Sequence, residues 1–347
     1  MLNIDLRSDT VTRPTEAMRS TMNSAITGDD VFAEDPEINT LQDRCAMMFG
    51  MEAGLFCPSG TMTNQIAISV HTSPGDEVIC DKLSHIYNYE GGGIARLSGA
   101  SVHLVDGDRG RFTSSQMKSS INPLASHFAK TTLVSLEDTC NKGGGSVWDM
   151  TMLREVSHEA RKSGLAVHLD GARLWNALVA RGVQNNTDAL IEYGSLFDSI
   201  SLCFSKGLGC PVGSVLIGSK DFISRAHRVR KVFGGGMRQA GFVAAAGIYA
   251  LDHNIDRLVI DHDRAKKLGE AALYHPSVKS CDEVITNIVI IELKDGVDAE
   301  SLVSEWGKLG IHCFPFSPTS VRFVTHMDNT DEQVEEACEL LMSNTKL

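Results

Sequence analysis

The sequence predicts an α/β fold: a large domain in which helices flank a mostly parallel sheet, followed by a small C-terminal α+β domain. Three observations support this prediction. Short apolar segments alternate with helical segments through residues 50–220, as they do where helices connect parallel strands. From about residue 277 the order becomes strand, helix, strand, strand, helix, which is typical of a small α+β unit. A chain of 347 residues is also long for one hydrophobic core, so a second domain is expected.

The chain is accordingly divided into three parts. Residues 1–35 are polar and irregular and are expected to form an N-terminal arm. Residues 36–250 are expected to form the large domain, and residues 251–347 a linking helix with the small domain. The arm either packs on a partner subunit or a site, or lies on the surface, and the residues favour neither.

Local signals set the element boundaries in the large domain. Pro36 suits the first turn of a helix and Gly50 suits its end, so a helix is expected between them. Strands are recognised as short apolar runs, and helices by an apolar stripe of period 3.6. The other elements expected here are strands at 55–57, 76–80, 101–105, 131–136, 165–169, 200–204 and 212–217, and helices at 62–71, 152–162 and 222–233.

The C-terminal third begins with a long helix rich in alanine and leucine. It is expected over about residues 240–273, either continuous or broken once. The last helix is expected to start at Thr330, a good N-cap residue. The small domain is then expected to contain strands at 284–293, 311–315 and 321–324, and helices at 299–309 and 330–343.

Composition argues against several classes of function. The net charge of −12 disfavours a nucleic-acid or anionic-membrane partner. No apolar run approaches the roughly 20 residues that a helix needs to cross a bilayer, and residues 1–7 lack the apolar stretch of a signal peptide. The nine cysteines are scattered and never spaced as C-x-x-C, which is typical of a reducing compartment. We therefore expect a cytoplasmic protein, and no motif predicts a metal site.

Lys206 is the most informative single residue. It follows the strand at 200–204 and Ser205, and it precedes a run rich in glycine, Gly207 to Gly213. Glycines leave room beside the lysine, so its amine can lie in a cleft. There desolvation lowers the pKa of an amine and frees it as a nucleophile toward carbonyls. On this stretch alone, a solvated loop lysine is the more common alternative.

A second candidate is the helix start at Ser59, Gly60 and Thr61. Free backbone N–H groups, two hydroxyls and the positive end of the helix dipole converge there, which suits a phosphate. The alternative is that Ser59 or Thr61 simply caps the helix, as these residues often do.

Two further candidates follow strands. His85 lies just beyond the strand at 76–80, and Asp170 ends the strand at 165–169. Open α/β sheets bind ligands at the carboxyl ends of their strands. A phosphate cradle, a flat ring, a carboxylate and a lysine together form the set that pyridoxal phosphate (PLP) needs: a lysine Schiff base, an acid on the pyridinium nitrogen and an anchored phosphate. PLP is therefore the predicted cofactor.

Six stretches carry a resemblance to a known family: Leu6–Thr12, Gly28–Val31, Pro58–Gln65, His168–Arg173, Ser205–Gly209 and Gly234–Gln239. In this order they resemble the low-specificity L-threonine aldolases, and the resemblance covers nearly the whole chain. It implies the aspartate-aminotransferase-like fold (fold type I), and usually a homotetramer built from dimers that share site residues. The reaction it implies is cleavage of L-threonine, L-allo-threonine and related β-hydroxy-α-amino acids to glycine and an aldehyde.

The resemblance also implies roles around the cofactor. Lys206 would bind PLP covalently, Asp170 would pair with the pyridinium nitrogen, and His85 would stack on the ring. Residues 59–61 would hold the phosphate. Arg238 would reach the phosphate from the same or a neighbouring subunit.

Other roles concern the small amino-acid substrate. Arg322 would clamp its α-carboxylate with help from Ser8, and Arg173 would serve either the ring's O3′ side or that carboxylate. His85 and His127 are the candidates for handling the substrate hydroxyl. Which of them acts as the base stays open, as does the preferred diastereomer.

Three alternatives remain. A dinucleotide-binding oxidoreductase is disfavoured because the glycines after Lys206 lead into a strand at 212–217, whereas a pyrophosphate needs a helix N-terminus. A PLP-dependent aminotransferase or β-eliminating lyase would share the fold, and the fold does not decide between them. A non-catalytic scaffold is disfavoured by the complete set of site residues.

Overall fold

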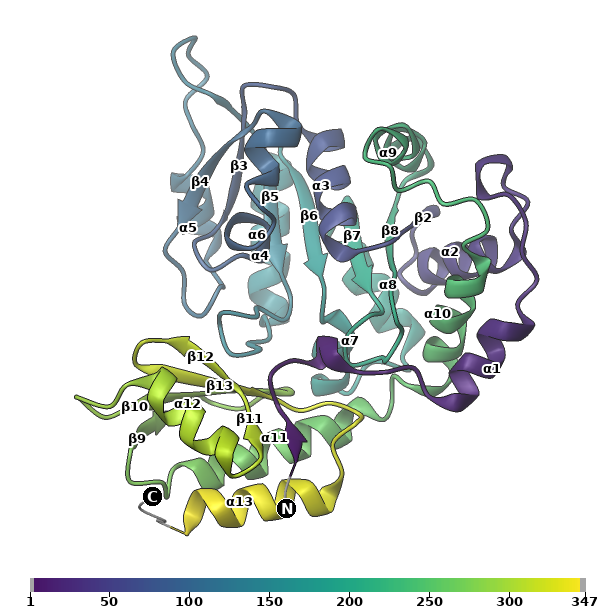
Figure 1. Ribbon diagram of the computed structural model, residues 1–347. Coiled ribbons are helices and arrows are strands. Elements are labelled where there is room, and N and C mark those ends of the chain that lie inside the picture. Colours follow the sequence, from purple (N-terminus) through teal and green to yellow (C-terminus); the bar gives the residue numbers. More distant parts are fainter. Residues whose placement is uncertain (1–2, 344–347) are drawn as a thin grey trace.

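The computed structural model describes residues 3–343 and divides into a larger and a smaller part (Figure 1). The larger part is built on a seven-stranded sheet of order β2-β8-β7-β6-β5-β3-β4. All neighbouring pairs are parallel except those of β8, which runs antiparallel to both β2 and β7. The mostly parallel sheet expected from the sequence is therefore confirmed. Its strands are β2 (Ala53–Cys57), β3 (Asp76–Asp81), β4 (Ser101–Val105), β5 (Lys130–Glu137), β6 (Ala166–Gly171), β7 (Ser199–Cys203) and β8 (Ser214–Gly218).

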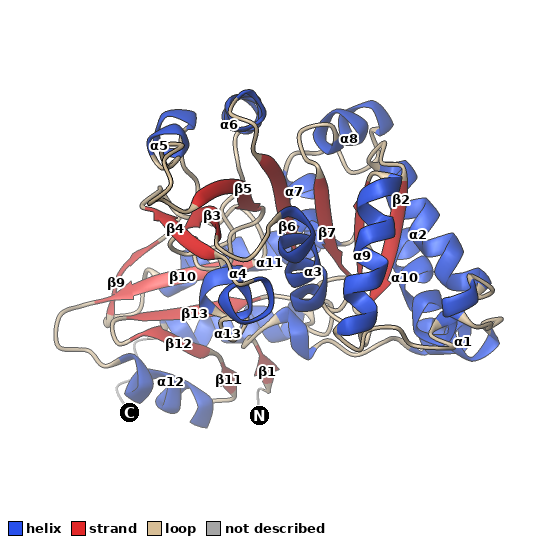
Figure 2. Ribbon diagram, turned by 90° about the horizontal axis from the view of Figure 1, so that it is seen from above, coloured by secondary structure: helices blue, strands red, loops and turns tan. Residues whose placement is uncertain are grey.

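Helices cover both faces of this sheet (Figure 2). Side chains alternate along a strand, so Leu55 and Phe56 of β2 lie on opposite faces and belong to different apolar clusters. One face packs against α3 (Gly60–His71) and α9 (Lys220–Val232). The other face packs against α2 (Pro36–Met48), α6 (Met150–Lys162), α7 (Leu174–Ala180), α8 (Thr187–Gly194) and α10 (Gly241–His253).

The smaller part has a four-stranded sheet of order β12-β13-β10-β9, in which every neighbouring pair is antiparallel. Most of its helices and strands contribute to one apolar cluster that includes Trp306 and Phe323. Its elements are α11 (Leu258–Ala272), β9 (Val278–Cys281), β10 (Ile288–Leu293), α12 (Ala299–Lys308), β11 (Ile311–His312), β12 (Phe314–Ser317), β13 (Ser320–Val324) and α13 (Asp331–Met342).

The N-terminal arm differs from the expectation that it is irregular. It contains α1 (Glu16–Ser24), whose N-cap Thr15 accepts the N–H of Met18. The methionine pair at positions 18 and 22 forms a short apolar stripe that could have signalled this helix. The arm also begins with β1 (Ile4–Asp5), which pairs in parallel with β11, so its first residues belong to the core of the smaller part. Only the tertiary pairing makes a two-residue strand.

Other boundaries also need correction. The helix expected over residues 240–273 is two helices, α10 and α11, separated near Asn254. The strand expected at 284–293 begins only at Ile288, and the one expected at 311–315 is divided between β11 and β12. Among residues 3–343, no helix has the length and apolar character needed to span a bilayer. Elements that were not expected from sequence are η1 (Asp9–Val11), η2 (Asp30–Phe32), α4 (His85–Asn88), η3 (Ile94–Ser98), α5 (Ser114–Ser119), α7, α8 and β9.

Candidate active site

The central strands end at a cavity of about 370 Å³. β5 ends in Glu137, β6 leads into Arg173, and β7 leads into Lys206, and all three side chains line this cavity. The opposite wall comes from the N-terminal arm and from strands β12 and β13, with Ser8 and Arg322 among its lining residues. The carboxyl edge of an open α/β sheet is the usual place for a ligand.

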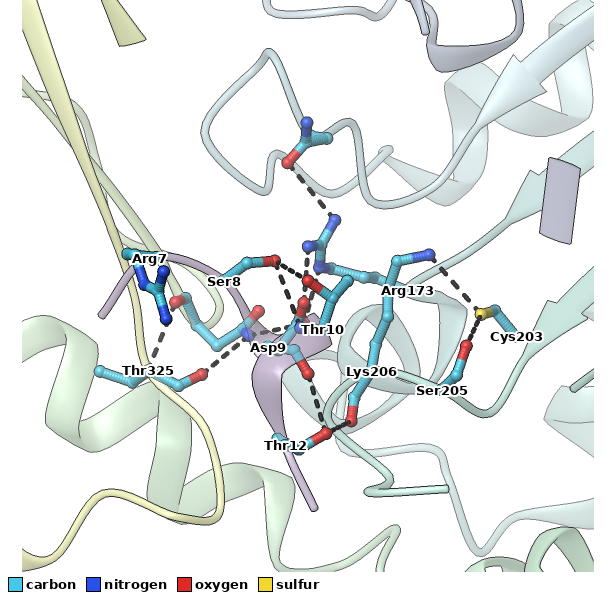
Figure 3. Close-up of polar contacts among 12 residues, drawn as sticks. Arg7, Ser8, Asp9, Thr10, Thr12, Arg173, Cys203, Ser205, Lys206 and Thr325 are labelled. Carbon is cyan, nitrogen blue, oxygen red and sulfur yellow. Dashed lines mark hydrogen bonds and ion pairs between the residues drawn. The ribbon is translucent and has the colours of Figure 1, made fainter. Parts of the chain in front are cut away.

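Lys206 projects into the cavity from the loop after β7. Its Nζ donates to Cys203 Sγ at 3.6 Å, as Figure 3 shows, so the amine contacts a thiol. Burial would raise the pKa of the Cys203 thiol, but the charge of Lys206 and a hydrogen bond from Ser205 lower it below the usual value. The amine therefore lies in a polar pocket beside an easily ionised sulfur.

The backbone of the Lys206 loop is held from three sides. Thr12 Oγ1 donates to the Lys206 carbonyl at 3.0 Å, which ties the N-terminal arm to the loop (Figure 3). Gly209 has a φ of +76°, and a Cβ there would lie 2.3 Å from the sulfur of Met327. A Cβ at Gly207 would lie 2.9 Å from Leu258. The glycines after the lysine are thus needed for close packing behind it.

Asp170 lies beneath the cavity and is only 2% exposed. Its Oδ1 accepts the backbone N–H of Ala172 at 3.0 Å, and its Oδ2 accepts from Asn64 Nδ2 at 2.9 Å. Asp170 also pairs in register with Glu137 of the neighbouring strand β5. Two acids therefore lie side by side at the carboxyl edge of the sheet.

Glu137 is buried, and its two oxygens accept the backbone N–H groups of His85 (2.7 Å) and Asn141 (2.9 Å). Burial and the negative charge of Asp170 raise the pKa of Glu137 to about 7. This carboxyl can therefore exchange a proton near neutral pH.

His85 begins the short helix α4 and lines the cavity. Its Nδ1 lies 3.0 Å from Glu90 Oε1. Burial would lower the pKa of His85, but the hydrogen bond with Glu90 and the charges of Asp170 and Glu137 raise it above the usual value. The ring is therefore oriented by one acid and is able to hold a proton.

Arg173 forms a buried ion pair with Asp9 of the N-terminal arm. The guanidinium donates to both oxygens of Asp9, at 2.8 and 2.7 Å. Burial would raise the pKa of Asp9, but the charge and hydrogen bonds of Arg173, with smaller contributions from Lys206 and Asn287, lower it to about 2. Arg173 thus lines the cavity with its charge already neutralised.

Arg322, on β13, lacks such a partner. Its Nη1 donates to Asn141 Oδ1 at 3.0 Å and its Nη2 to the Arg7 carbonyl at 3.1 Å, both neutral acceptors. Its buried Nε has no hydrogen-bond partner among the described residues. Burial and the like charge of Arg173 lower the pKa of Arg322 to about 10. This cation would therefore gain from an anion in the cavity.

The helix start expected to bind phosphate is formed as predicted. Ser59 is the N-cap of α3, and its Oγ accepts the N–H of Met62 at 3.2 Å. The hydroxyl of Ser59 therefore has a capping contact, while the first N–H groups of the helix, at Gly60 and Thr61, lack intrahelical partners. A Cβ at Gly60 would point toward Ser214 Oγ and Cys203 Sγ, so this helix start adjoins the Lys206 loop.

Six expected site residues do not line the cavity: Asp170, Ser59, Gly60, Thr61, His127 and Arg238. Asp170 and the start of α3 adjoin residues of the cavity wall, whereas His127 and Arg238 do not. His127 lies on an exposed loop before the first residue of β5, whereas the cavity lies beyond its last residue, Glu137. The eight residues of β5 separate these ends by about 25 Å. Arg238 is 59% exposed and pairs with Asp29 at 3.0 Å, away from the lining residues. The roles expected for both remain predictions.

Sequence reasoning missed several residues of this site. Glu137 ends a strand just as Asp170 does, so the same rule could have identified it. Asp9 and Asn141 lie in polar segments without any local pattern, and their partners are 164 and 181 residues away in the chain. Asn64 and Glu90 are buried polar residues whose roles depend on side chains from other elements.

Comparisons with known proteins agree with this geometry. The family model of the beta-eliminating lyases matches residues 5–295. The low specificity L-threonine aldolase of Escherichia coli strain K12 is 41% identical over 334 residues, covering 96% of both proteins. The low-specificity L-threonine aldolase 1 of Arabidopsis thaliana is 39% identical over 341 residues, covering 96% of this chain and 94% of that protein. A solved structure of the threonine aldolase of Leishmania major has the same fold, with a TM-score of 0.82 at 20% identity over 97% of this chain and 98% of that one.

The fold and the site together define a PLP-dependent enzyme of the aspartate-aminotransferase-like fold type I. The fold and the cofactor expected from sequence are thereby confirmed. The chain belongs to the beta-eliminating lyase family, and its relatives within that family include low-specificity L-threonine aldolases.

Proposed function

We propose that this protein uses PLP to cleave L-threonine, L-allo-threonine and related β-hydroxy-α-amino acids to glycine and an aldehyde. One observation carries the proposal: a single cavity joins the amine of Lys206, the ring of His85 and the uncompensated guanidinium of Arg322. These groups match an amino-acid substrate that has a carboxylate and a β-hydroxyl. Relatives at 39–41% identity are named for this activity.

The residues present fit PLP. Lys206 would hold the cofactor covalently, and the N–H groups at the start of α3 would hold its phosphate. Asp170 offers a buried carboxylate for a ring nitrogen, and His85 offers a flat ring at the cavity wall. When bound, PLP supplies an electron sink for the electron pair of the bond that breaks.

The substrate carboxylate would lie against the wall formed by the arm and the small domain. Arg322 would accept it as the missing anion, because its present acceptors are neutral. Ser8 is placed to help. Its Oγ accepts from the N–H and the hydroxyl of Thr10, so its own proton is free to be donated to a carboxylate.

His85 is the better-placed candidate for the base. Its Nδ1 faces the carboxylate of Glu90, which can only accept, so Nδ1 carries a hydrogen. The other nitrogen, Nε2, would then take the proton of the substrate hydroxyl. As that proton leaves, the Cβ–O bond becomes a carbonyl and the Cα–Cβ bond breaks. A proton returned to Cα completes glycine, and no other reactant is needed.

The test is to record the absorbance of the purified protein with PLP and to measure aldehyde release from L-threonine and from L-allo-threonine. Cofactor absorbance together with acetaldehyde and glycine in equal amounts is the expected result. Absorbance without aldehyde would overturn the aldolase proposal. Conversion of the cofactor to pyridoxamine phosphate by a keto acid would then favour an aminotransferase. Keto-acid and ammonia release would favour a β-eliminating lyase.

We also propose that the protein is a homotetramer assembled from dimers that share site residues. Ile26 (70%), Phe32 (69%) and Val232 (82%) are among the strongly exposed apolar side chains of the described residues. They lie on segments that the buried Arg230–Asp30 ion pair holds together, so they belong to one region of the surface. A second copy of the chain is the occupant that suits such an apolar region. Light scattering of the purified protein tests the assembly.

The division into arm, large domain and small domain remains our proposal for the chain. The main apolar cluster of the large sheet ends at Leu258, and the separate cluster of the small part includes Ala265 of the same helix, α11. This supports a division within α11, between Leu258 and Ala265, a few residues beyond the proposed boundary at residue 251. We likewise propose a cytoplasmic location, which the free state of the nine cysteines supports.

A further inference from the structure

One buried amide contacts both acids that lie under the cavity. We propose that Asn64, on α3, is a positioning residue that clamps the carboxylates of Asp170 and Glu90 together and thereby fixes the orientation of the His85 ring. The inference rests on the proposed function, because Asp170 and His85 take their roles from it. Asn64 itself is only 2% exposed and does not line the cavity, so it would act through these neighbours.

The clamp is made by a single nitrogen. Asn64 Nδ2 donates to Asp170 Oδ2 and to Glu90 Oε1, each at 2.9 Å. A ring nitrogen of His85 and one carboxylate oxygen each of Glu90 and Asp170 all lie within 4.8 Å of one another. Two buried carboxylates at this separation repel each other unless donors lie between them. The two N–H groups of Asn64 supply those donors, and they occupy the oxygens that a cation would need.

The rest of the network allows only one orientation of this amide. Because carboxylates accept, the nitrogen of Asn64 must face them, and its Oδ1 must face His168 Nε2 at 3.1 Å. Because the Asn64 oxygen can only accept, His168 Nε2 carries a hydrogen. His168 Nδ1 then accepts from the hydroxyl of Ser199 at 2.9 Å, and the Ser199 oxygen accepts from His71 Nε2 at 2.8 Å.

Both histidines have the charge state that this order requires. Burial lowers the pKa of His168 to about 3 and that of His71 to about 4. Each ring is therefore neutral near pH 7 and carries one N–H, which is what a chain of single donors needs. The chain runs from His71 through Ser199 and His168 to Asn64, and it holds the amide in place from the side away from the acids.

The clamp has a consequence for His85. Glu90 Oε1 accepts from both Asn64 and His85 Nδ1, and its other oxygen accepts from Gln65 Nε2 at 2.6 Å. If the donors of Asn64 were lost, Glu90 and Asp170 would face each other without a donor between them, and their repulsion would move Glu90 away. His85 Nδ1 would then lose its fixed acceptor, and the ring would no longer be held in one orientation. One amide thus couples Asp170, the acid that would serve the cofactor, to His85, the ring that would serve the substrate.

The variant that isolates this effect is Asn64→Asp. It keeps the shape of the side chain and an oxygen facing His168, but it replaces the NH2 group, with its two N–H donors, by an oxygen of a third carboxylate. Gln65→Met is the matched control, because Gln65 donates to Glu90 and not to Asp170. We expect the dissociation constant for PLP, from an absorbance titration, to rise about tenfold to a hundredfold in Asn64→Asp, and to change by less than about threefold in Gln65→Met. In both variants kcat should fall.

A second measurement needs neither cofactor nor substrate. Nitrogen-15 NMR of the histidine rings in the cofactor-free wild-type protein should show His168 neutral with its hydrogen on Nε2, and His85 with a hydrogen on Nδ1. In Asn64→Asp the His85 signals should change, whereas a merely structural change would leave the tautomer as it is. If Asn64→Asp does not fold by circular dichroism, Asn64→Ala replaces it in both measurements.

The outcomes separate the clamp from the proposed function. A wild-type His168 that carries its hydrogen on Nδ1 overturns the clamp, as does an Asn64→Asp or Asn64→Ala protein that binds PLP as tightly as wild type. A second outcome is that the wild-type protein cleaves no β-hydroxy amino acid but shows the expected tautomers, while Asn64→Asp shows the expected fall in PLP affinity. This outcome overturns the proposed reaction and leaves the clamp standing.

Discussion

The two walls of the cavity differ in charge. The wall from the large sheet carries the acid Glu137 beside Lys206, with the buried Asp170 behind it, whereas the wall from the arm and the small domain carries Arg322, which has no acid partner among residues 3–343. Arg173, also on the wall from the large sheet, is neutralised by Asp9 of the arm. The difference shows that the two walls serve different ligands. The acidic wall suits a cofactor whose ring nitrogen is protonated, and the basic wall suits the carboxylate of the substrate.

Removing the amine of the acidic wall should have the largest effect. In Lys206→Ala the covalent attachment point for PLP is lost, so aldehyde release should fall by about a thousandfold or more. The measurement is kcat for L-threonine together with the absorbance of bound PLP. A variant that retained full turnover and an unchanged cofactor spectrum would refute the role of Lys206.

Changes at the basic wall should act mainly on substrate binding. In Arg322→Leu the charge and both donor groups are lost, so KM should rise about tenfold to a hundredfold. Arg322→Lys is the control, because it keeps the charge but loses the two-point fork, and it should give an intermediate KM. If KM for Arg322→Leu equalled that of wild type, the carboxylate would have to bind elsewhere.

The compensated arginine tests stability. In Asp9→Asn the Arg173 charge is left buried without its partner, so the free energy of unfolding should fall by about 3–5 kcal/mol. Because the pKa of Asp9 is lowered to about 2, its contribution in the wild type is present above about pH 4 and is lost as the pH falls toward 2.

Urea midpoints of the cofactor-free wild-type and variant proteins between pH 2 and pH 7 would measure this effect. The difference between the two proteins should be largest at neutral pH and should shrink in acid. If the difference in urea midpoint between the two proteins did not change with pH, the ionised Asp9 carboxylate would not be the source of the stabilisation.

Glu137 should give the smallest effect, and one of opposite sign. Its pKa is raised to about 7, so the folded state holds a proton that the unfolded state releases near pH 4.5. The contribution of Glu137 to the free energy of unfolding is therefore fully present below about pH 4.5. It is lost as the pH rises through about 7, a change of at most about 3 kcal/mol.

The variant Glu137→Gln keeps the shape of the side chain without the charge, so it should flatten this decline. The pH dependence of the urea midpoint of the cofactor-free protein measures it. A decline as steep in Glu137→Gln as in the wild type would assign the titration to another group.

Much of the fold could be predicted because its signals are local. The apolar runs that form β3, β5 and β6 and the Pro36 start of α2 can be read from a few neighbouring residues. The helices α7 and α8 were missed because both are short, and β1 because it is a strand only through its pairing with residues 311–312. The arm looked irregular in part for this reason, although its helix α1 has a local signal in Met18 and Met22.

The sequence by itself determined the alternating order of strands and helices, the strand-end positions of Lys206, Asp170 and His85, and the capped helix start at Ser59. Each of these follows from short-range rules of backbone geometry. Only the tertiary structure decided which charges are compensated. Asp9 meets Arg173 across 164 residues, and Asn64 meets Asp170 across 106, whereas Arg322 meets no acid within the part of the chain that the structure describes. Burial and pairing set the charge of a group, and both depend on contacts that no local pattern encodes.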